Sequence, residues 1–468
     1  MPDKGMSGRC TAADCLHVNQ TVSTLSLIHI FTEGVIWRQL LNFFFPIIIG
    51  TFFQQLYNTA DAVIVGRFLG KTALAAAGGS TAVLINLVVL FFINLSSGAS
   101  VVISQFYGAR KLKEMSDTIH TAIAMALVGG LLISVFGILL TPAVLRAMHT
   151  PSDVLPLAIT YLQIYFGGMI AVLVYNVGTA ILRAVGDSRR PLYFLIVACA
   201  INVVLDLLLV KVIPMGIAGA SLATVLAQII SALLVIITLV RTKEAYKLTL
   251  RKIRFDFPIL RRIIYIGFPA GVQSSMFQLS NILIQATLNG FGTDVVAGWT
   301  AFNKIDALYW MGSNAFGVSI MTFAGQNFGA GKFDRIRKSS RICLAMDAAY
   351  SIFLSVIMVV FGRVLLMMFS TDAVVISNGY QILLTMAPFY ITYICVEIYS
   401  GTIRGVGNTV IPMLMTCFGI CVLRVLWIFF WMPTHHTVRM LVTSYPLTWI
   451  FTSVLFVLYY FRGHWLRH

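Results

Sequence analysis

Long apolar runs, separated by short polar loops, fill almost the whole chain. Each run is long enough to cross the roughly 30 Å hydrocarbon core of a bilayer as a helix, which takes about 20 residues. Lipid offers no hydrogen bonds to the backbone, so such runs must be helical. The runs lie at residues 38–66, 74–106, 117–142, 157–181, 191–212, 217–240, 262–290, 296–326, 342–366, 377–402, 411–432 and 438–461. This pattern predicts an all-α integral membrane protein with twelve transmembrane helices.

The composition agrees with a protein embedded in lipid. Of the 468 residues, 59% are hydrophobic and 11% are charged, against about 25% charged residues in an ordinary soluble domain. Lys and Arg number 33 and Asp and Glu 17, an excess that also occurs in nucleic-acid-binding proteins. Here the basic residues gather in short loops between apolar runs, which is typical of topology signals. We therefore expect no nucleic-acid partner.

The basic loops indicate the orientation in the membrane. Every second loop is rich in Lys and Arg, as at 110–113, 183–190, 241–262 and 332–341, whereas the alternate loops are poor in them. The positive-inside rule places the basic loops in the cytoplasm. Because the number of spans is even, we expect both termini there too, in a multi-pass protein of the plasma membrane.

Four landmarks of the first half recur in the same order in the second half. The pairs are Phe45-Pro46 with Phe268-Pro269, QLYN (55–58) with QLSN (278–281), SQFYGARK (104–111) with GQNFGAGK (325–332), and LRAVGDSRRP (182–191) with IRGVGNTVIP (403–412). The offset hardly changes from pair to pair, which indicates a duplicated unit. Six spans per copy is an even number, so both copies enter from the same side and a pseudo-two-fold axis along the membrane normal relates them.

The repeat divides the chain into parts. We expect an N-terminal six-helix lobe at 33–240, a cytoplasmic connector at 241–261 and a C-terminal six-helix lobe at 262–468. Residues 1–32 do not fit the pattern, since their one apolar run is too short to span a membrane, and we expect a disordered or artefactual leader there. Two lobes of this kind enclose a cavity near the bilayer midplane, which is typical of secondary transporters.

The first copy carries two carboxylates at membrane depth, where each is a functional candidate because an isolated charge is costly. Asp61 lies in the first span, fifteen residues after Pro46, a proline that we expect to kink this helix as Pro269 kinks its counterpart. Asp206 lies in the fifth span, and Asn202 precedes it by four residues, on the same helical face. With the hydroxyl of Thr224, these groups form an oxygen-rich cage for Na⁺ or a pair of carboxylates that shares a proton.

The second copy differs in charge. Ile284 stands where the first copy has Asp61, Glu397 replaces Asn176, and Arg424 falls at or beside the position that matches Asn202. Two readings stay open, since Glu397 and Arg424 can form a buried ion pair that locks the tenth and eleventh helices, or Glu397 can face the cavity and receive a cationic compound.

Several polar and aromatic side chains are candidates for lining the cavity, because aromatic faces bind flat cations. Lipid-facing or interfacial positions are the alternative for each aromatic residue. Asn303, Lys304 and Asp306 open the eighth span, where their spacing suits a local structural pair as well as a ligand role. The cavity candidates are Gln55, Tyr57, Asn176, Gln278, Tyr309, Glu397 and Arg424, together with Tyr165 and Trp310.

Motifs of other function classes are incomplete in this sequence. GRFLGKT at 66–72 has three residues between its glycines, where a phosphate-binding loop needs four. His435-His436 lacks the helical spacing and the acidic partner of a hydrolytic zinc site, and the chain has no GxSxG stretch. We therefore expect neither an enzyme nor a bound cofactor.

From about Gln39 to Phe461 the chain resembles the multidrug and toxic compound extrusion (MATE) family. The most specific motifs are FPIIIGTFFQQLYNTADAVIVGRFLG in the first span, the GARK and GAGK loops, the two RxxG…P loops, and INVVLDLLLV followed by GIAGASLATV. The resemblance implies a V-shaped pair of six-helix lobes that exports small organic cations or amphipathic drugs, driven by an inward Na⁺ or H⁺ gradient. We expect the protein to be a monomer.

The resemblance also bears on the coupling site. Asp61, Asn202, Asp206 and Thr224 match the cation site that the family places in its N-terminal lobe. Some members carry an acidic residue in the seventh span, but this sequence has MFQLSN there, with Gln278 and no carboxylate. We therefore expect coupling in the first lobe. The alternative function is a flippase or exporter of a lipid-linked saccharide or small metabolite on a related fold.

Overall fold

The computed structural model describes residues 31–434, 436–463 and 465–466, which form helices joined by short loops. The first half contains α2 (Ile36–Leu69), α3 (Lys71–Gly78), α4 (Ser80–Gly108), α5 (Leu112–Ala147), α6 (Leu155–Gly167), α7 (Met169–Ala184), α8 (Arg189–Asp206), η2 (Leu207–Val212) and α9 (Ile217–Arg241). The second half contains η3 (Leu250–Lys252), α10 (Phe257–Asn289), α11 (Thr293–Gly329), α12 (Phe333–Met367), α13 (Ala373–Met386), η4 (Ala387–Phe389), α14 (Tyr390–Gly405), α15 (Val410–Thr416), η5 (Cys417–Val422), α16 (Leu423–Phe430) and α17 (Val438–Arg462).

These helices supply the twelve predicted spans. Within the described residues, nine helical segments are long and apolar enough to cross a membrane, and a tenth is formed if α6 and α7, bent by 49° at Gly168, make one span. The remaining two spans are α10 and α11, of 33 and 37 residues. They are less apolar because polar side chains such as Gln278 and Asn314 line a pocket. The predicted all-α membrane protein is confirmed.

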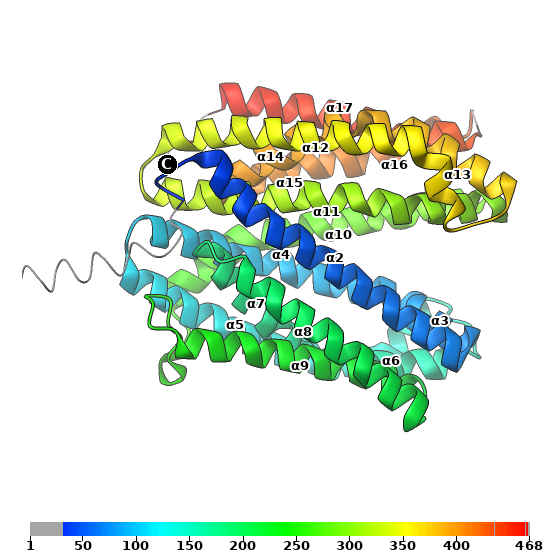
Figure 1. Ribbon diagram of the computed structural model, residues 1–468, viewed down its shortest axis with the longest axis horizontal. Coiled ribbons are helices and arrows are strands. Elements are labelled where there is room, and N and C mark those ends of the chain that lie inside the picture. Colours follow the sequence, from blue (N-terminus) through cyan, green and yellow to red (C-terminus); the bar gives the residue numbers. More distant parts are fainter. Residues whose placement is uncertain (1–30, 435, 464, 467–468) are drawn as a thin grey trace, which may run out of the picture.

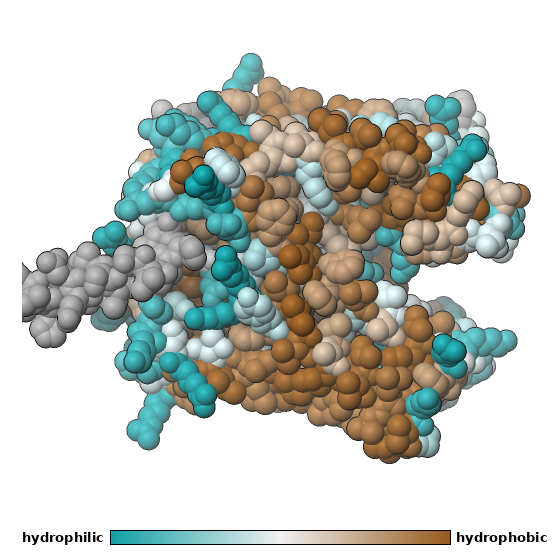
Figure 2. Space-filling view, in the orientation of Figure 1, coloured by the Kyte–Doolittle hydropathy of each residue, from teal (hydrophilic) through white to brown (hydrophobic). Residues whose placement is uncertain are grey.

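The helices form two lobes with separate hydrophobic cores (Figure 1). One core is built mainly from α4, α5, α7 and α9, and the other from α11, α13, α14 and α17. The first helix of each half also contacts the opposite lobe: α2 packs against α11, and α10 packs against α4. Large apolar side chains such as Leu139, Val204 and Val360 are exposed on the outside, and Figure 2 shows apolar surface between two polar ends. This is the surface that a bilayer requires.

The lobes touch at one end of the bundle, here called the basic end, which carries the loops 109–111, 185–188, 242–256, 330–332 and 406–409. The opposite end carries the loops 148–154, 213–216, 290–292 and 368–372, and there Figure 2 shows a recess between the lobes. The structure is therefore closed at the basic end and open at the other.

Two buried glutamines join the lobes at the basic end. Gln105 of α4 donates a hydrogen bond to the carbonyl oxygen of Gly405, 3.0 Å away, and Gln326 of α11 donates to that of Ala184 at 2.8 Å. Gln105 also accepts from Arg262. The two glutamines occupy matching places in SQFYGARK and GQNFGAGK, and so do the two carbonyl groups in the RxxG…P loops. We call this pair of contacts the glutamine clamp.

The connector is fixed to the start of α5. The backbone N–H of Thr249 donates to Nε2 of His120 at 3.0 Å, and Nδ1 of the same ring lies 2.6 Å from the carbonyl oxygen of Ser116. The N–H of Asp256 donates to the Thr121 hydroxyl at 3.1 Å. These bonds hold residues 249–256 against the first lobe.

Replacing His120 with Ala is expected to loosen the connector. Loss of one hydrogen bond costs about 1 kcal/mol, which raises the fraction of molecules with a detached connector about fivefold. Limited trypsin digestion should therefore cut within 241–254 about five times faster in this variant. The variant His149→Asn, which changes an exposed histidine in a loop at the opposite end, serves as the control. Equal cleavage rates in the two variants would show that His120 does not hold the connector against α5.

The leader boundary needs a correction. Residues 1–30 lie outside the described part of the chain, but Phe31 and Thr32 are buried, at 2% and 6% exposure. Phe31 stacks on Phe323, and its N–H donates to Gln326. The fold therefore includes Phe31, because an aromatic side chain and two backbone groups find partners on α11.

Both predicted kink residues lie inside helices, Pro46 in α2 and Pro269 in α10. Proline lacks an N–H and leaves the carbonyl group four residues earlier without its helical partner. For Pro269 this is the carbonyl group of Tyr265, whose oxygen accepts a hydrogen bond from the hydroxyl of Thr409 at 3.4 Å. The kinks themselves stay a prediction.

Candidate functional site

A cluster of polar side chains lies within the first lobe, where α2, α8 and α9 meet. Asn202 and Asp206 are fully buried one turn apart at the end of α8, which places both on one helical face, as their spacing predicted. Thr224 is buried on α9, and Asp61 is half-buried on α2. Asp61 and Asp206 lie within electrostatic range of each other. We call these four residues the first-lobe cluster.

The carboxylate and amide groups of this cluster lack protein partners within the described chain. Both oxygens of Asp206, Oδ1 of Asp61 and both polar atoms of the Asn202 amide are buried without a hydrogen bond. Neither aspartate forms an ion pair with Lys or Arg in this part of the chain. A buried carboxylate without a partner is costly. Oxygen atoms of this kind can bind Na⁺, and two neighbouring carboxylates can share a proton.

Tyrosines complete the cluster. Tyr57 lies beside Thr224 and within electrostatic range of Asp61 and Asp206. Tyr161 of α6 is 5% exposed and within range of the same two aspartates. The sequence analysis missed Tyr161, although its spacing of four residues from Tyr165 places both on one helical face.

A pocket of about 540 Å³, here called the second-lobe pocket, lies on the side of the second lobe that faces α4. Three of the predicted cavity residues line it: Gln278 of α10, Trp310 of α11 and Arg424 of α16. Gln55, Tyr57 and Asn176 belong to the first lobe, and the Asn176 amide donates to the Val172 carbonyl oxygen within its own helix. The lining residues are Leu90, Ser274, Phe277, Gln278, Asn281, Gln285, Trp299, Asn303, Asp306, Trp310, Asn314, Met386, Tyr393, Arg424, Tyr445 and Trp449.

Tyr309 does not line this pocket. The ring is 0% exposed and stacks on Tyr390 with ring centroids 4.0 Å apart. The hydroxyl donates to the Tyr390 carbonyl oxygen at 3.1 Å. The prediction of a cavity role is wrong here, because every part of this side chain has a partner inside the core.

Glu397 and Arg424 do not form the ion pair considered from the sequence, since no ion pair joins them within the described chain. The Glu397 carboxylate packs against α11 at Gly317, where any larger residue would overlap it. Arg424 instead lies over the ring of Tyr445. Glu397 is not among the residues that line the second-lobe pocket, and its role as a cavity residue stays a prediction. The two side chains therefore contact different neighbours, Gly317 for Glu397 and Tyr445 for Arg424.

Two acidic residues of the second lobe have roles that the sequence did not reveal. Asp306 accepts hydrogen bonds from the hydroxyl of Tyr390 and from Nε1 of Trp310, the latter at 2.7 Å. It therefore lines the pocket and does not pair with the exposed Lys304. Asp347 of α12 is fully buried, accepts from Ser313 at 3.4 Å, and keeps Oδ1 without a partner. The spacing of acidic residues along the sequence gives no signal for either arrangement.

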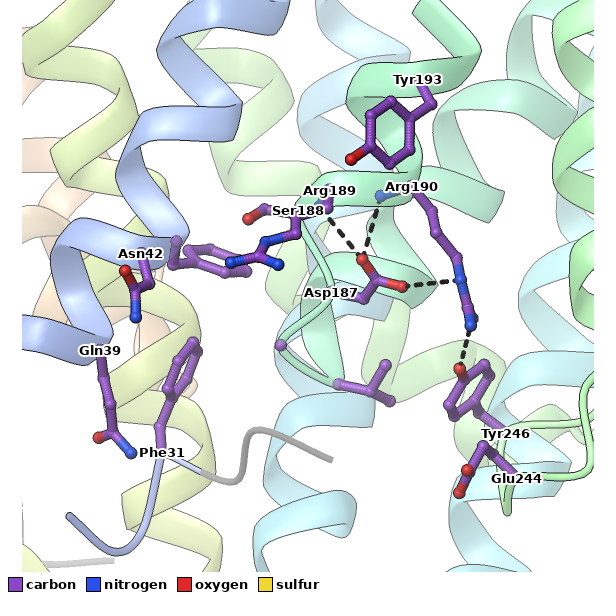
Figure 3. A pocket seen from close by; sticks show the side chains of 13 residues that line it. Phe31, Gln39, Asn42, Asp187, Ser188, Arg189, Arg190, Tyr193, Glu244 and Tyr246 are labelled. Atoms are coloured by element: carbon purple, nitrogen blue, oxygen red, sulfur yellow. Dashed lines mark hydrogen bonds and ion pairs between the residues drawn. The ribbon is translucent and has the colours of Figure 1, made fainter. Parts of the chain in front are cut away.

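A further pocket, of about 440 Å³, lies at the basic end between α2 and the loop before α8 (Figure 3). Asp187 accepts from the backbone N–H groups of Arg189 and Arg190, each at 3.1 Å. The Arg190 guanidinium pairs with Asp187 at 3.3 Å and donates to the Tyr246 hydroxyl at 2.9 Å. The charges of Asp187 and Arg190 thus satisfy each other, unlike those of the first-lobe cluster.

Comparison with known proteins agrees with the fold. The family model MatE matches residues 46–208 and 269–430. The chain is 30% identical to the probable multidrug resistance protein YpnP of Bacillus subtilis over 84% of this chain and 88% of that protein. It is 28% identical to the probable multidrug resistance protein YoeA of the same organism, over 82% and 84%.

The fold is also similar to the solved structure of a MOP superfamily transporter from Pyrococcus furiosus. The TM-score is 0.86 at 21% sequence identity, covering 94% of this chain and 98% of the other. The two matched segments of the family model together span more than half of the sequence. This chain therefore belongs to the MatE family of multidrug efflux transporters.

Proposed function

We propose that this protein is an antiporter that uses an inward Na⁺ or H⁺ gradient to export cationic or amphipathic organic compounds. The observation that carries this proposal is the first-lobe cluster. Asp61, Asn202 and Asp206 hold buried polar atoms without hydrogen bonds in the described chain, and no basic residue there pairs with either carboxylate. A small cation would supply the missing positive charge.

The arrangement of the lobes suggests how the ion drives transport. We place the basic end in the cytoplasm by the positive-inside rule, so the described state opens to the outside. A cation that enters the cluster from the outside neutralises the carboxylates and favours release of the exported compound. The lobes, 33–240 and 262–468, then move against each other about the connector 241–261 and open to the cytoplasm, where the cation leaves. Each ligand shifts the same two-state equilibrium in an opposite direction.

Efflux from vesicles tests the proposal. Purified protein is reconstituted in liposomes loaded with a cationic fluorescent dye, and Na⁺ and pH gradients are imposed separately. We expect one of the two gradients to drive dye export at least about tenfold above the rate without a gradient, since a tenfold gradient supplies about 1.4 kcal/mol. Export that is equally slow under both gradients would refute ion coupling.

A further inference from the structure

A groove on the surface of the second lobe, here called the α13–α17 groove, takes no part in the sites described above. It has a volume of about 800 Å³ and lies between α13 and α17. Met386 and Tyr445 of the same two helices line the second-lobe pocket instead. The groove is therefore formed by other faces of these helices and is a separate feature of the lobe.

The α13–α17 groove opens toward the lipid. Figure 1 shows α17 along the side of the second lobe that lies away from the first lobe, so the groove does not belong to the recess between the lobes. A helix face on that side meets the acyl chains of the bilayer. Four large apolar residues of the lining are 39% to 43% exposed there, namely Leu384, Phe389, Leu447 and Ile450.

Both helices of the groove start at the end of the bundle opposite the basic end. α13 begins at Ala373, directly after the loop 368–372. α17 runs the same way, because Tyr459 near its last turn accepts a hydrogen bond from Asn408 in a loop of the basic end. Depth in the membrane can therefore be counted along both helices from their first residues.

Polar and apolar lining residues are separated along this depth. At 1.5 Å per residue, Phe389 and Ile450 lie about 18–24 Å from the helix starts. Thr385 lies about 18 Å deep, but its hydroxyl donates to the Gln381 carbonyl oxygen within the helix. The other polar lining residues all lie within about 12 Å of the helix starts, namely Asn378, Gln381, Thr437, Arg439 and Thr443. The groove thus has a polar entrance and an apolar interior.

The polar entrance carries an unbalanced positive charge. Arg439 is the only charged residue among the described lining residues, and its exposed side chain forms no ion pair in this part of the chain. The nearest acidic residue at the start of α13 is Asp372, which lies outside the lining and accepts from the backbone N–H groups of Val374 and Val375. The guanidinium therefore offers its N–H donors to an anion from the membrane.

We propose that the α13–α17 groove binds an anionic phospholipid. Its phosphate contacts Arg439 and the amides of Asn378 and Gln381, and one acyl chain lies on Phe389 and Ile450. A basic recess between membrane helices is suited to an anionic headgroup. A zwitterionic lipid would bring a cation for which the lining holds no carboxylate. The lipid is a bound component of the protein's surroundings and not the exported compound, so this inference goes beyond the proposed function.

Fluorescence quenching in vesicles tests the site. Ile450→Cys, in a background without other cysteines, is labelled with bimane and reconstituted in phosphatidylcholine vesicles that contain brominated phosphatidylglycerol or brominated phosphatidylcholine. We expect half-maximal quenching at an about fivefold lower mole fraction of the phosphatidylglycerol, which is the contribution of one basic residue near the membrane surface. Equal mole fractions would overturn the proposal.

A label elsewhere separates the groove from the bulk lipid. Val360→Cys on α12, at a side chain that is 65% exposed, should be quenched equally by the two brominated lipids. The same fivefold preference at both positions would overturn a specific site in the groove. Quenching at Val360→Cys but by neither lipid at Ile450→Cys would also overturn the proposal, because another occupant, such as a second copy of the chain, would then cover the groove.

Variants assign the preference to one side chain. Arg439→Gln should bring the two half-maximal mole fractions at Ile450→Cys within twofold of each other, whereas Arg439→Lys should retain part of the preference because its charge remains. Arg146→Gln is the matched control, since Arg146 is an exposed arginine at the same end of the bundle and outside the groove. A full preference in Arg439→Gln would overturn the proposal.

Native mass spectrometry supplies a readout that needs no label and no cysteine-free background. Wild-type protein in detergent with equal amounts of phosphatidylglycerol and phosphatidylcholine should carry about fivefold more of the former. Arg439→Gln should carry the two lipids equally, and Arg146→Gln should behave as wild type does. Equal binding of both lipids by the wild-type protein would overturn the proposal.

Discussion

Replacing Asp206 with Asn is expected to reduce gradient-driven efflux about a hundredfold, to near the leak of empty vesicles. The substitution keeps the size of a side chain that is fully buried and removes the charge that a coupling cation would neutralise. Removing one partner of a buried charge pair costs roughly 3 kcal/mol or more, which corresponds to about a hundredfold in affinity. Dye efflux from proteoliposomes under the driving gradient measures the effect.

Exchange without a gradient separates coupling from folding. Asp206→Asn should still exchange labelled for unlabelled dye across the vesicle membrane, because the second-lobe pocket is intact. Asp61→Asn should lose coupling as well, and full gradient-driven efflux by that variant would show that the site is wrongly assigned. The control is Asp334→Asn, at a side chain that is 90% exposed, which should transport as wild type does.

We expect transport to require that the hydrogen bonds of the glutamine clamp form. The variant Gly108→Leu, which changes a residue packed against Gln326, should therefore reduce efflux at least about tenfold. A Cβ atom at Gly108 would overlap the backbone of Gln326, and one at Gly329 would overlap the backbone of Gln105. Backbone atoms in a packed interface cannot move aside cheaply, and overpacking costs about 1–3 kcal/mol. The variant should therefore favour the state in which the basic end is open.

Spin labels at the basic end measure this shift directly. Cysteines replacing the exposed Lys113 and Lys338, in a background without other cysteines, should show a longer distance in Gly108→Leu than in wild type. Gly167→Leu is the matched control, because a Cβ atom at Gly167 meets nothing within 4 Å. An unchanged distance together with normal efflux would show that the clamp does not gate the basic end.

The sequence predicted the elements and their duplication for a clear physical reason. A membrane span must be apolar over about 20 consecutive residues, and this property can be recognised from the sequence of the span alone. The same holds for Asn202 and Asp206, whose spacing places them on one helical face whatever surrounds the helix. The recurring motifs also contained Gln105 and Gln326, but their role stayed unrecognised because a hydrogen bond between lobes depends on partners about 300 and 140 residues away.

Side-chain direction within the second lobe is what the sequence could not predict. Its helices are apolar on most faces, so hydropathy does not tell which face meets the pocket and which meets another helix. Tyr309 therefore looked like a cavity residue but stacks on Tyr390, and the contact of the Glu397 carboxylate with Gly317 could not be foreseen. Asp306 looked like part of an interfacial pair but lines the pocket.

The sequence by itself thus determined the membrane class and the twelve spans, and it predicted the duplicated plan and the four residues of the first-lobe cluster, since each depends on local composition, spacing or repetition. Only the tertiary structure decided that the lobes close at the basic end, that Glu397 and Arg424 form no ion pair, and that Asp306 and Arg424 line the same pocket. These features depend on how helices rotate and pack against one another, which is set by contacts between residues far apart in the chain.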